Sequence, residues 1–287
     1  MKTLSRRRFA VASLLGLTVP LLPRIANAQD SAGYRFSPVN QYGVELTARY
    51  WNPIIDRVAM TSGVKLQLKI GRTSADTTAF VIANEVEFVF TNHLFSPERE
   101  RMGWKIFGRR RTPPIHSQIV VLADSPIMKL EDLANQAVAF PGPEALVAYR
   151  FAYAQLLNRN IAVQVVFGGN MDGAFTQLAS GKVLAVGANS QLTAGWVQRE
   201  GKRVRVLWQS EPLHDLPLMA SRKVSERDLL ALSRAFVQMS MDPKGRSVLA
   251  DAAELVKLPA GTDFVASDGS EYGAYRSFYK TAPAIVR

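Results

Sequence analysis

The stretch at residues 138–151, VAFPGPEALVAYRF, has the residue types that most directly suggest ligand chemistry. Its pattern predicts a short buried strand, a Gly/Pro turn and then an apolar helix. A helix that follows a strand offers free backbone N–H groups and the positive end of its dipole to an anion. The first turn of this predicted helix, however, carries a carboxylate of its own, Glu144. We therefore interpret Glu144 either as a surface acid, which is the simpler alternative, or as a contact for a cation or a hydrogen-bond donor.

Polar side chains follow other predicted strands in the same way. In α/β proteins, ligands are bound outside the carboxyl ends of the strands, so a polar residue directly after an apolar run is a candidate for lining a ligand site. A later helix opens with Asn170, Met171 and Asp172, and Asp172 is its expected cap. The candidates found by this rule are Gln41, Tyr42, Thr91, Asn92, His93, Asn189 and Ser190.

The sequence contains no motif for catalysis or for a cofactor. It has no cysteine, no Gly-x-Ser-x-Gly and no His-Glu-x-x-His, and its Gly-rich GGNMDG lacks the spacing of a dinucleotide loop. The three histidines, His93, His116 and His214, are not spaced four residues from another metal-ligand type. We therefore expect a binding protein and not an enzyme, with no metal and no cofactor.

The N-terminus has the pattern of an export signal. Basic residues precede an apolar stretch at 9–22 and an Ala-Asn-Ala site, after which cleavage is expected at residue 28. The Ser-Arg-Arg-Arg-Phe run at 5–9 favours twin-arginine export over general secretion. The apolar stretch is too short to span a bilayer, and the lack of cysteine excludes a lipid-modified N-terminal Cys. The sequence thus predicts a signal peptide at 1–28 and a soluble protein in the periplasm.

Charge narrows the range of partners. Removal of the first 28 residues takes away five basic residues and no acid, so the net charge falls from +11 to +6 over the remaining 259 residues. The dense basic run at 109–111 is interpreted as a solvated loop, with docking to a membrane partner or an acidic ligand as the alternative. Basic and aromatic residues do not interleave in stripes, so nucleic-acid binding is not expected.

Strand and helix patterns alternate through the first two thirds of the chain. A helical spacing from Leu46 to Val58 ends at Ser62-Gly63, a typical stop signal. The apolar runs at 86–90 and 117–123 are typical of buried parallel strands. Further strands are predicted at 64–70, 163–167, 183–188 and 204–208, separated by helical segments. This alternation predicts an α/β fold built on parallel sheets.

The pattern changes after about residue 212. Ser225 is placed to cap one helix, and a second helix is predicted to begin at Asp242-Pro243. The tail at 271–280 has an aromatic stripe, which we interpret as core packing.

Several segments carry a family resemblance. In order along the chain they are RYWNPIIDRVAMTSGVKLQLKI, VEFVF, HSQIVVLADSPIMKLEDLANQAVAF, FGGNMDGAFTQLASGKVLAVGANS and VRVLWQSEPLHDLPLMASRKVSE. They resemble the periplasmic substrate-binding proteins of the phosphonate, phosphite and phosphate uptake family, within the type 2 solute-binding superfamily. The resemblance covers most of residues 34–255.

This resemblance implies a type 2 periplasmic-binding-protein fold, in which two α/β lobes are joined by a two-stranded hinge and the ligand lies between them. By segment order, lobe one would comprise 30–113 plus 212–287, and lobe two 114–211. The two crossovers would fall near 113–117 and 208–213. Closure about such a hinge would bury a solute and create the form that a permease recognises.

The resemblance also implies pocket positions, and this chain departs from the family at several of them. The family's hydroxyl run at the start of a lobe-two helix corresponds here to Glu144, Ala145, Leu146 and Val147, so every hydroxyl is absent. A family acid that would neutralise a ligand amine corresponds to Leu184. The remaining matched positions are Ser74, His116, Ser117 and Met171.

These departures predict a changed ligand. We expect an exported monomer that captures a small solute, such as an oxyanion or a small organic acid, and delivers it to an ABC permease at the inner membrane. An aminoalkyl phosphonate is not the expected solute. The alternative is a periplasmic sensor component that presents its closed form to a histidine kinase.

Overall fold

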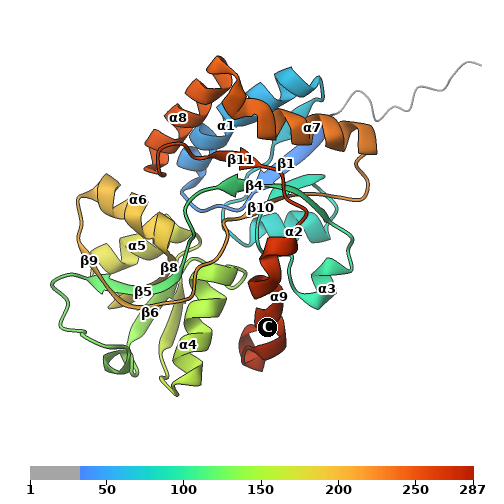
Figure 1. Ribbon diagram of the computed structural model, residues 1–287. Coiled ribbons are helices and arrows are strands. Elements are labelled where there is room, and N and C mark those ends of the chain that lie inside the picture. Colours follow the sequence, from blue (N-terminus) through green and yellow to red (C-terminus); the bar gives the residue numbers. More distant parts are fainter. Residues whose placement is uncertain (1–32) are drawn as a thin grey trace, which may run out of the picture. The chain divides into compact units, whose positions relative to one another are not determined.

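Two β-sheets organise residues 33–287, the part of the chain that this computed structural model describes (Figure 1). A six-stranded sheet has the strand order β11-β4-β10-β3-β1-β2, and a five-stranded sheet has the order β7-β6-β8-β5-β9. The predicted signal peptide at residues 1–28 lies outside the described residues.

The six-stranded sheet takes its strands from two separate stretches of the chain. They are β1 (Tyr34–Pro38), β2 (Leu66–Leu68), β3 (Phe88–Phe90), β4 (Lys105–Arg111), β10 (Pro217–Ala220) and β11 (Asp263–Val265). The helices of the same stretches are α1 (Val44–Ser62), α2 (Asp76–Ile82), α3 (Pro97–Glu100), α7 (Glu226–Gln238), α8 (Pro243–Val256) and α9 (Gly273–Thr281).

The five-stranded sheet is formed by the continuous segment between these stretches. Its strands are β5 (Ser117–Leu122), β6 (Ala137–Phe140), β7 (Gln164–Phe167), β8 (Ala185–Asn189) and β9 (Val204–Gln209). Its helices are a π-helix (Leu146–Phe151) that continues into α4 (Ala152–Asn158), then α5 (Met171–Ala179) and α6 (Ser190–Glu200).

Two connections run side by side between the sheets. One leads from β4 into β5 and the other from β9 into β10, and they pair through an antiparallel bridge between Ile115 and Leu213. The two backbone hydrogen bonds of this bridge are 2.8 and 2.9 Å long. The two lobes are thus linked by a two-stranded hinge.

The sheets are mixed, so the prediction of parallel sheets is wrong in part. β3 is parallel to β1 but antiparallel to β10, and β5 is antiparallel to both of its neighbours, β8 and β9. An apolar run reports that both faces of a strand are covered. It carries no information about the direction of the neighbouring strands, which depends on where the chain crosses between the sheets.

Three of the local start and stop signals are confirmed. α1 ends at Ser62, and Gly63 adopts a left-handed φ of 70° that returns its N–H to the carbonyl of Ala59. The Ser225 side chain accepts a hydrogen bond from the backbone N–H of Asp228 at the start of α7, and Asp242 accepts one from Gly245 at the start of α8. These signals involve residues within one turn of each other, and for that reason the sequence alone reveals them.

The basic run at 109–111 was predicted to be a solvated loop, and this is wrong. It lies in β4, where successive side chains point to opposite faces of the sheet. Arg110 is therefore fully buried, and its Nε donates to the Asp215 carboxylate at 2.7 Å. Arg109 pairs with Glu271 and Arg111 with Asp263 on the other face.

The aromatic stripe at 271–280 packs in the core, as predicted. Tyr272, Tyr275, Phe278 and Tyr279 are buried in one apolar cluster with residues of both lobes. The Phe278 ring stacks on Phe151 of the π-helix with the ring centroids 4.4 Å apart. Figure 1 shows α9 descending beside α4, so the C-terminal helix contacts the lobe that contains the five-stranded sheet.

We expect the Arg110–Asp215 pair to dominate the stability of the region beside the hinge. Asp215→Asn keeps the shape of the side chain but leaves a fully buried guanidinium without its counter-charge. Breaking a buried pair in this way costs about 3–5 kcal/mol of unfolding free energy, which urea denaturation can measure. The control is Glu131→Gln, whose pair with Arg159 is half exposed and should cost less than about 1 kcal/mol. Equal losses in the two variants would contradict this assignment.

Candidate functional site

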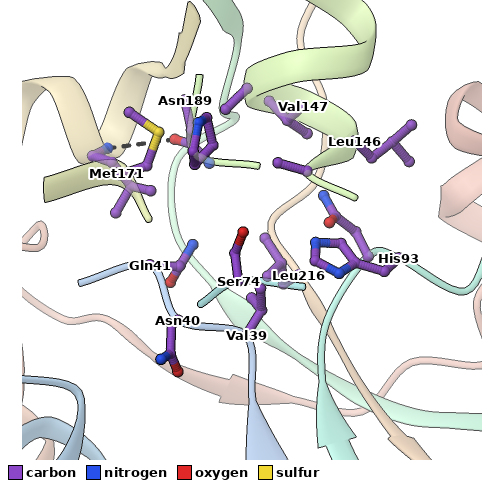
Figure 2. Close-up of a pocket in the computed structure, with 15 residues that line it drawn as sticks. Val39, Asn40, Gln41, Ser74, His93, Leu146, Val147, Met171, Asn189 and Leu216 are labelled. Carbon is purple, nitrogen blue, oxygen red and sulfur yellow. Dashed lines mark hydrogen bonds between the residues drawn. The ribbon is translucent and has the colours of Figure 1, made fainter. Parts of the chain in front are cut away.

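A small cavity of about 40 Å³ lies between the two lobes (Figure 2). It is bordered by the ends of β1 and β3 from one sheet and of β6 and β8 from the other. A cavity needs roughly 10–15 Å³ to hold one water, so this one has room for a group about as large as three waters. Its lining residues are Val39, Asn40, Gln41, Ser74, Asn92, His93, Pro141, Ala145, Leu146, Val147, Ala148, Met171, Asn189, Leu192 and Leu216.

The lining is uncharged. Its polar members are three asparagines, one glutamine, one serine and one histidine, and the other nine residues are apolar. No Asp, Glu, Lys or Arg is among the fifteen lining residues. Figure 2 shows the hydroxyl of Ser74 and the amide of Gln41 directed toward the space below Leu146 and Val147, whereas the Asn40 side chain points away from it. A ligand here would meet neutral hydrogen-bonding groups and apolar walls.

The structure brings together six of the residues that the sequence singled out as ligand contacts. They are Ser74, Asn92, His93, Ala145, Met171 and Asn189. Gln41, found by the same strand-end rule, also lines the cavity. Strands that are parallel within each sheet end at one edge, and the two edges face each other between the lobes.

The other five predicted contacts do not line the cavity. Tyr42 is buried under the guanidinium of Arg199, which lies 5.4 Å from its ring centroid. The Thr91 hydroxyl accepts a hydrogen bond from the backbone N–H of His93 at 3.1 Å. His116 is half-buried beside the hinge, with Nδ1 2.8 Å from the carbonyl oxygen of Ser210.

Ser117 and Glu144 are the remaining two of these five. Ser117 is buried at the start of β5, and its hydroxyl has no hydrogen-bond partner among the described residues. Glu144 was expected in the first turn of a helix, and this is wrong, because the helix begins at Leu146 after Ala145 as its cap residue. The predicted Gly/Pro turn extends one residue further than expected and includes Glu144.

The carboxylate of Glu144 is engaged by two arginines. It forms an ion pair with Arg99 of α3, which belongs to the other lobe, and lies 3.7 Å from Arg150 of its own lobe. Burial raises the pKa of Glu144, but the Arg99 hydrogen bond and the charges of Arg99 and Arg150 outweigh this and hold the pKa below its usual value. Glu144 is thus a carboxylate that ties the lobes together.

His93 is a buried, neutral histidine. Its Nδ1 lies 3.0 Å from the hydroxyl of Thr78, and its side chain is 1% exposed. Burial, helped by the charges of Arg99 and Arg150, lowers its pKa to about 3. At neutral pH the imidazole can present a neutral hydrogen-bonding nitrogen to a ligand but no charge.

Ser74 sits where the lobes touch. Its backbone N–H donates to the carbonyl of Gly169 in the other lobe at 2.7 Å. A Cβ at Gly142 would lie 2.7 Å from the Ser74 hydroxyl oxygen, so a larger residue at this position would force the hydroxyl to move. The Ser74 hydroxyl has no hydrogen-bond partner among residues 33–287.

The helix α5 is capped differently from the prediction. Asn170, not Asp172, caps it by accepting a hydrogen bond from the backbone N–H of Gly173. Asp172 instead pairs with Arg199 at 2.6 Å and accepts a hydrogen bond across the lobes from the N–H of Gly43 at 3.1 Å. Burial raises the pKa of Asp172.

The sequence reasoning missed Val39, Asn40 and Leu216 as lining residues. The first two directly follow β1, so the strand-end rule could have found them. Leu216 precedes β10. It reaches the same edge only because β10 runs antiparallel to β3, and the sequence carries no signal for that direction.

Neither a metal centre nor a membrane span is visible in the described part of the chain. No three His, Asp or Glu side chains among residues 33–287 gather closely enough to hold a metal ion. Within the same residues, no helix combines the length and the apolar character needed to cross a bilayer.

Most of the described chain matches a known protein family. The model described as ABC transporter, phosphonate, periplasmic substrate-binding protein matches residues 36–272. No curated protein sequence matches the chain.

Solved structures show the same fold. A binding protein component of an ABC phosphonate transporter from Pseudomonas aeruginosa is 16% identical, with a TM-score of 0.71 and 86% of each chain covered. PhnD1 from Prochlorococcus marinus, in complex with methylphosphonate, is 12% identical, with a TM-score of 0.72 and coverage of 86% of this chain and 97% of that one. The aliphatic sulphonate binding protein SsuA from Escherichia coli is 14% identical, with a TM-score of 0.53 and 86% of each chain covered. The predicted type 2 periplasmic-binding-protein fold is confirmed.

The buried imidazole of His93 should make stability depend on pH. Its pKa is about 3 in the folded protein against an ordinary value of 6.5, so between these values the unfolded chain binds a proton that the folded chain does not. The unfolding free energy should therefore fall as the pH drops below 6.5, by up to about 1.4 kcal/mol per pH unit from this group. In His93→Asn the slope between pH 6.5 and 4.5 should be shallower than in wild type. The exposed His214, as His214→Asn, is the control, and an equal change of slope in both variants would contradict the role of His93.

Glu144→Gln should weaken the tie between the lobes without altering which ligand is bound. The lowered pKa of Glu144 means that its contribution is present above about pH 4.5 and is lost as the pH falls through the folded-state pKa. At pH 7 we expect a loss of about 1–3 kcal/mol, the usual value for a hydrogen bond to a charged group. The exposed Glu98, on the same helix as Arg99, gives the control Glu98→Gln. An altered ligand preference in Glu144→Gln would return Glu144 to the ligand site.

Proposed function

The chain belongs to the family of phosphonate periplasmic substrate-binding proteins of ABC transporters, and from this premise we propose that it is an exported protein which captures a small solute between its lobes and delivers it to an ABC-type permease. The family is one of substrate-binding proteins for transport and is not a family of enzymes. The observation that carries the proposal is a cavity lined by residues of both lobes.

The position of the cavity supports capture by closure. Its two walls belong to different sheets, and the chain passes from one sheet to the other through the paired connections at Ile115 and Leu213. Rotation about such a hinge would open the cavity to solvent and close it over a solute. We propose residues 30–113 plus 212–287 and residues 114–211 as the two bodies that move.

The lining argues against an aminoalkyl phosphonate. The corner at 144–147 contributes Ala145, Leu146 and Val147 to the cavity and no hydroxyl. An ammonium group would be buried there without a carboxylate to neutralise it, which costs several kcal/mol. We propose Ser74, Asn92, His93 and Asn189 as the polar contacts. Ala145 and Met171 are proposed as apolar contacts.

The five remaining sequence candidates stay predictions. Tyr42, Thr91, His116, Ser117 and Glu144 lie near the cavity or the hinge but outside the lining, and a ligand would reach them only if the lobes moved. Presentation of the closed form to a sensor kinase is the alternative function. No observation on the described residues or among the comparisons favours it over transport, because the matched family is one of ABC transport.

A thermal-shift screen of the purified protein tests solute capture. The probes are phosphite, methylphosphonate, a short sulfonate and short organic acids, with aminoethylphosphonate included as the solute expected not to bind. A ligand at 100 times its dissociation constant should add about 2.7 kcal/mol of stability at 25 °C. No shift with any small solute, together with turnover of one of them, would overturn the proposal. In Gly142→Ala the shift should be smaller, because the added methyl group would meet the Ser74 hydroxyl.

A further inference from the structure

Gln41 connects the cavity to a buried positive charge. Its side chain is 8% exposed and lines the cavity. The Nη2 of Arg110 donates to the Oε1 of Gln41 at 3.3 Å. A guanidinium can only donate hydrogen bonds, so this contact fixes the amide with its oxygen toward Arg110. Figure 2 shows the amide nitrogen turned to the side of the Ser74 hydroxyl, where it is available to a ligand.

The side-chain amide of Asn189, in the other lobe, is also held by its oxygen. The Oδ1 of Asn189 accepts hydrogen bonds from the backbone N–H groups of Gln191 and Leu192, at 2.8 and 3.4 Å. Backbone N–H groups also only donate, so the oxygen of Asn189 is used by them and its NH₂ group remains to donate to a ligand. The Ser74 hydroxyl, in a residue that is 2% exposed, has no partner among the described residues. The cavity thus offers hydrogen-bond donors from both lobes.

The acids near the cavity are already paired. Asp215 is held by Arg110, Glu144 by Arg99 and Asp172 by Arg199. None of the three acids is among the lining residues. A cationic ligand would therefore find no counter-charge, whereas an oxygen acceptor would meet an amide polarised by the guanidinium behind it.

We propose that Gln41 is a specificity-determining residue of the cavity: its amide nitrogen, turned to the ligand by Arg110, donates to an oxygen acceptor of the solute and disfavours an amine. Gln41 is the residue that sets this preference, and Arg110 is the positioning residue that holds Gln41. The inference rests on the proposed capture of a small solute.

Calorimetric titration of the purified protein with acetate, propionate, methylphosphonate and ethylammonium tests the preference. We expect the best oxygen ligand to bind at least 10-fold more tightly than ethylammonium. Gln41→Met keeps the length of the side chain but removes the donor, and should weaken binding of that ligand by about 10- to 100-fold, the usual range for a hydrogen bond to a charged group. Gln41→Glu, which keeps the shape of Gln41, should reduce or invert the preference over ethylammonium.

Gln191→Met is the matched control. Gln191 accepts from the same Nη2 of Arg110 at 3.2 Å but does not line the cavity. Its loss should leave the ratio of the acid and amine affinities unchanged. The melting temperature of each unliganded variant shows whether it is folded, and Gln41→Glu tests the preference if Gln41→Met does not fold.

The positioning role of Arg110 is tested by a double-mutant cycle. Arg110→Lys keeps a positive charge beside Asp215 but loses the planar fork that also reaches Gln41. If Arg110 acts through Gln41, adding Gln41→Met to Arg110→Lys should weaken binding less than twofold further. Additive losses would overturn the positioning role.

Two other outcomes would overturn the inference, and they are distinguishable. Binding of an oxygen ligand with equal affinity to wild type and to a folded Gln41→Met would contradict the role of Gln41 and leave solute capture standing. Tighter binding of ethylammonium than of any acid by the wild type would contradict the ligand class. Absence of binding by every probe here and in the thermal-shift screen would remove the proposed function together with the inference.

Discussion

The fully buried ion pair between Arg110 and Asp215 contacts the hinge, the cavity lining and both lobes, and their arrangement depends on it. Arg110 is the second-to-last residue of β4, close to one connection between the lobes, and Asp215 lies in the other connection. The guanidinium also contacts Tyr50 of the core, Gln41 of the cavity and Gln191 of the opposite lobe. A charge in this position must satisfy nearly all of its donors within the protein, because the cost of burying it unpaired exceeds what most contacts can return. Its neighbours are therefore held in fixed orientations.

Charged residues surround the cavity without entering it. The pairs that Glu144 and Asp172 form with arginines lie at its rim, and each acid also contacts the lobe opposite its own. The hydrogen bond between Ser74 and Gly169 joins the lobes at a third point. Because these contacts satisfy the charges in pairs, the enclosed space remains neutral, and its chemistry is set by amides, one hydroxyl and one uncharged imidazole.

The corner at 138–151 has a role different from an anion site built on a helix N-terminus. The Gly/Pro turn delays the helix to Leu146, and the first six helical residues form a π-helix. Apolar residues of this corner then form one wall of the cavity, while Glu144 turns to Arg99. The corner therefore supplies apolar lining residues and an ion pair, and it supplies no anion site. The hydrogen-bond donors for a ligand come from elsewhere in the fold.

The sequence alone predicts the long helices, the caps at Ser225 and Asp242, the stop at Gly63, the α/β character and the family resemblance, because these depend on residues close in the chain or on segment order. It also located several cavity residues, since strand ends can be read locally. Only the tertiary structure decided that β10 brings Leu216 to the same edge, that Arg110 is buried while its two neighbours are not, and that Glu144 pairs with Arg99. Each of these depends on which distant segment lies opposite, and the periodicity of a single segment reports its burial pattern but never the identity of its partner.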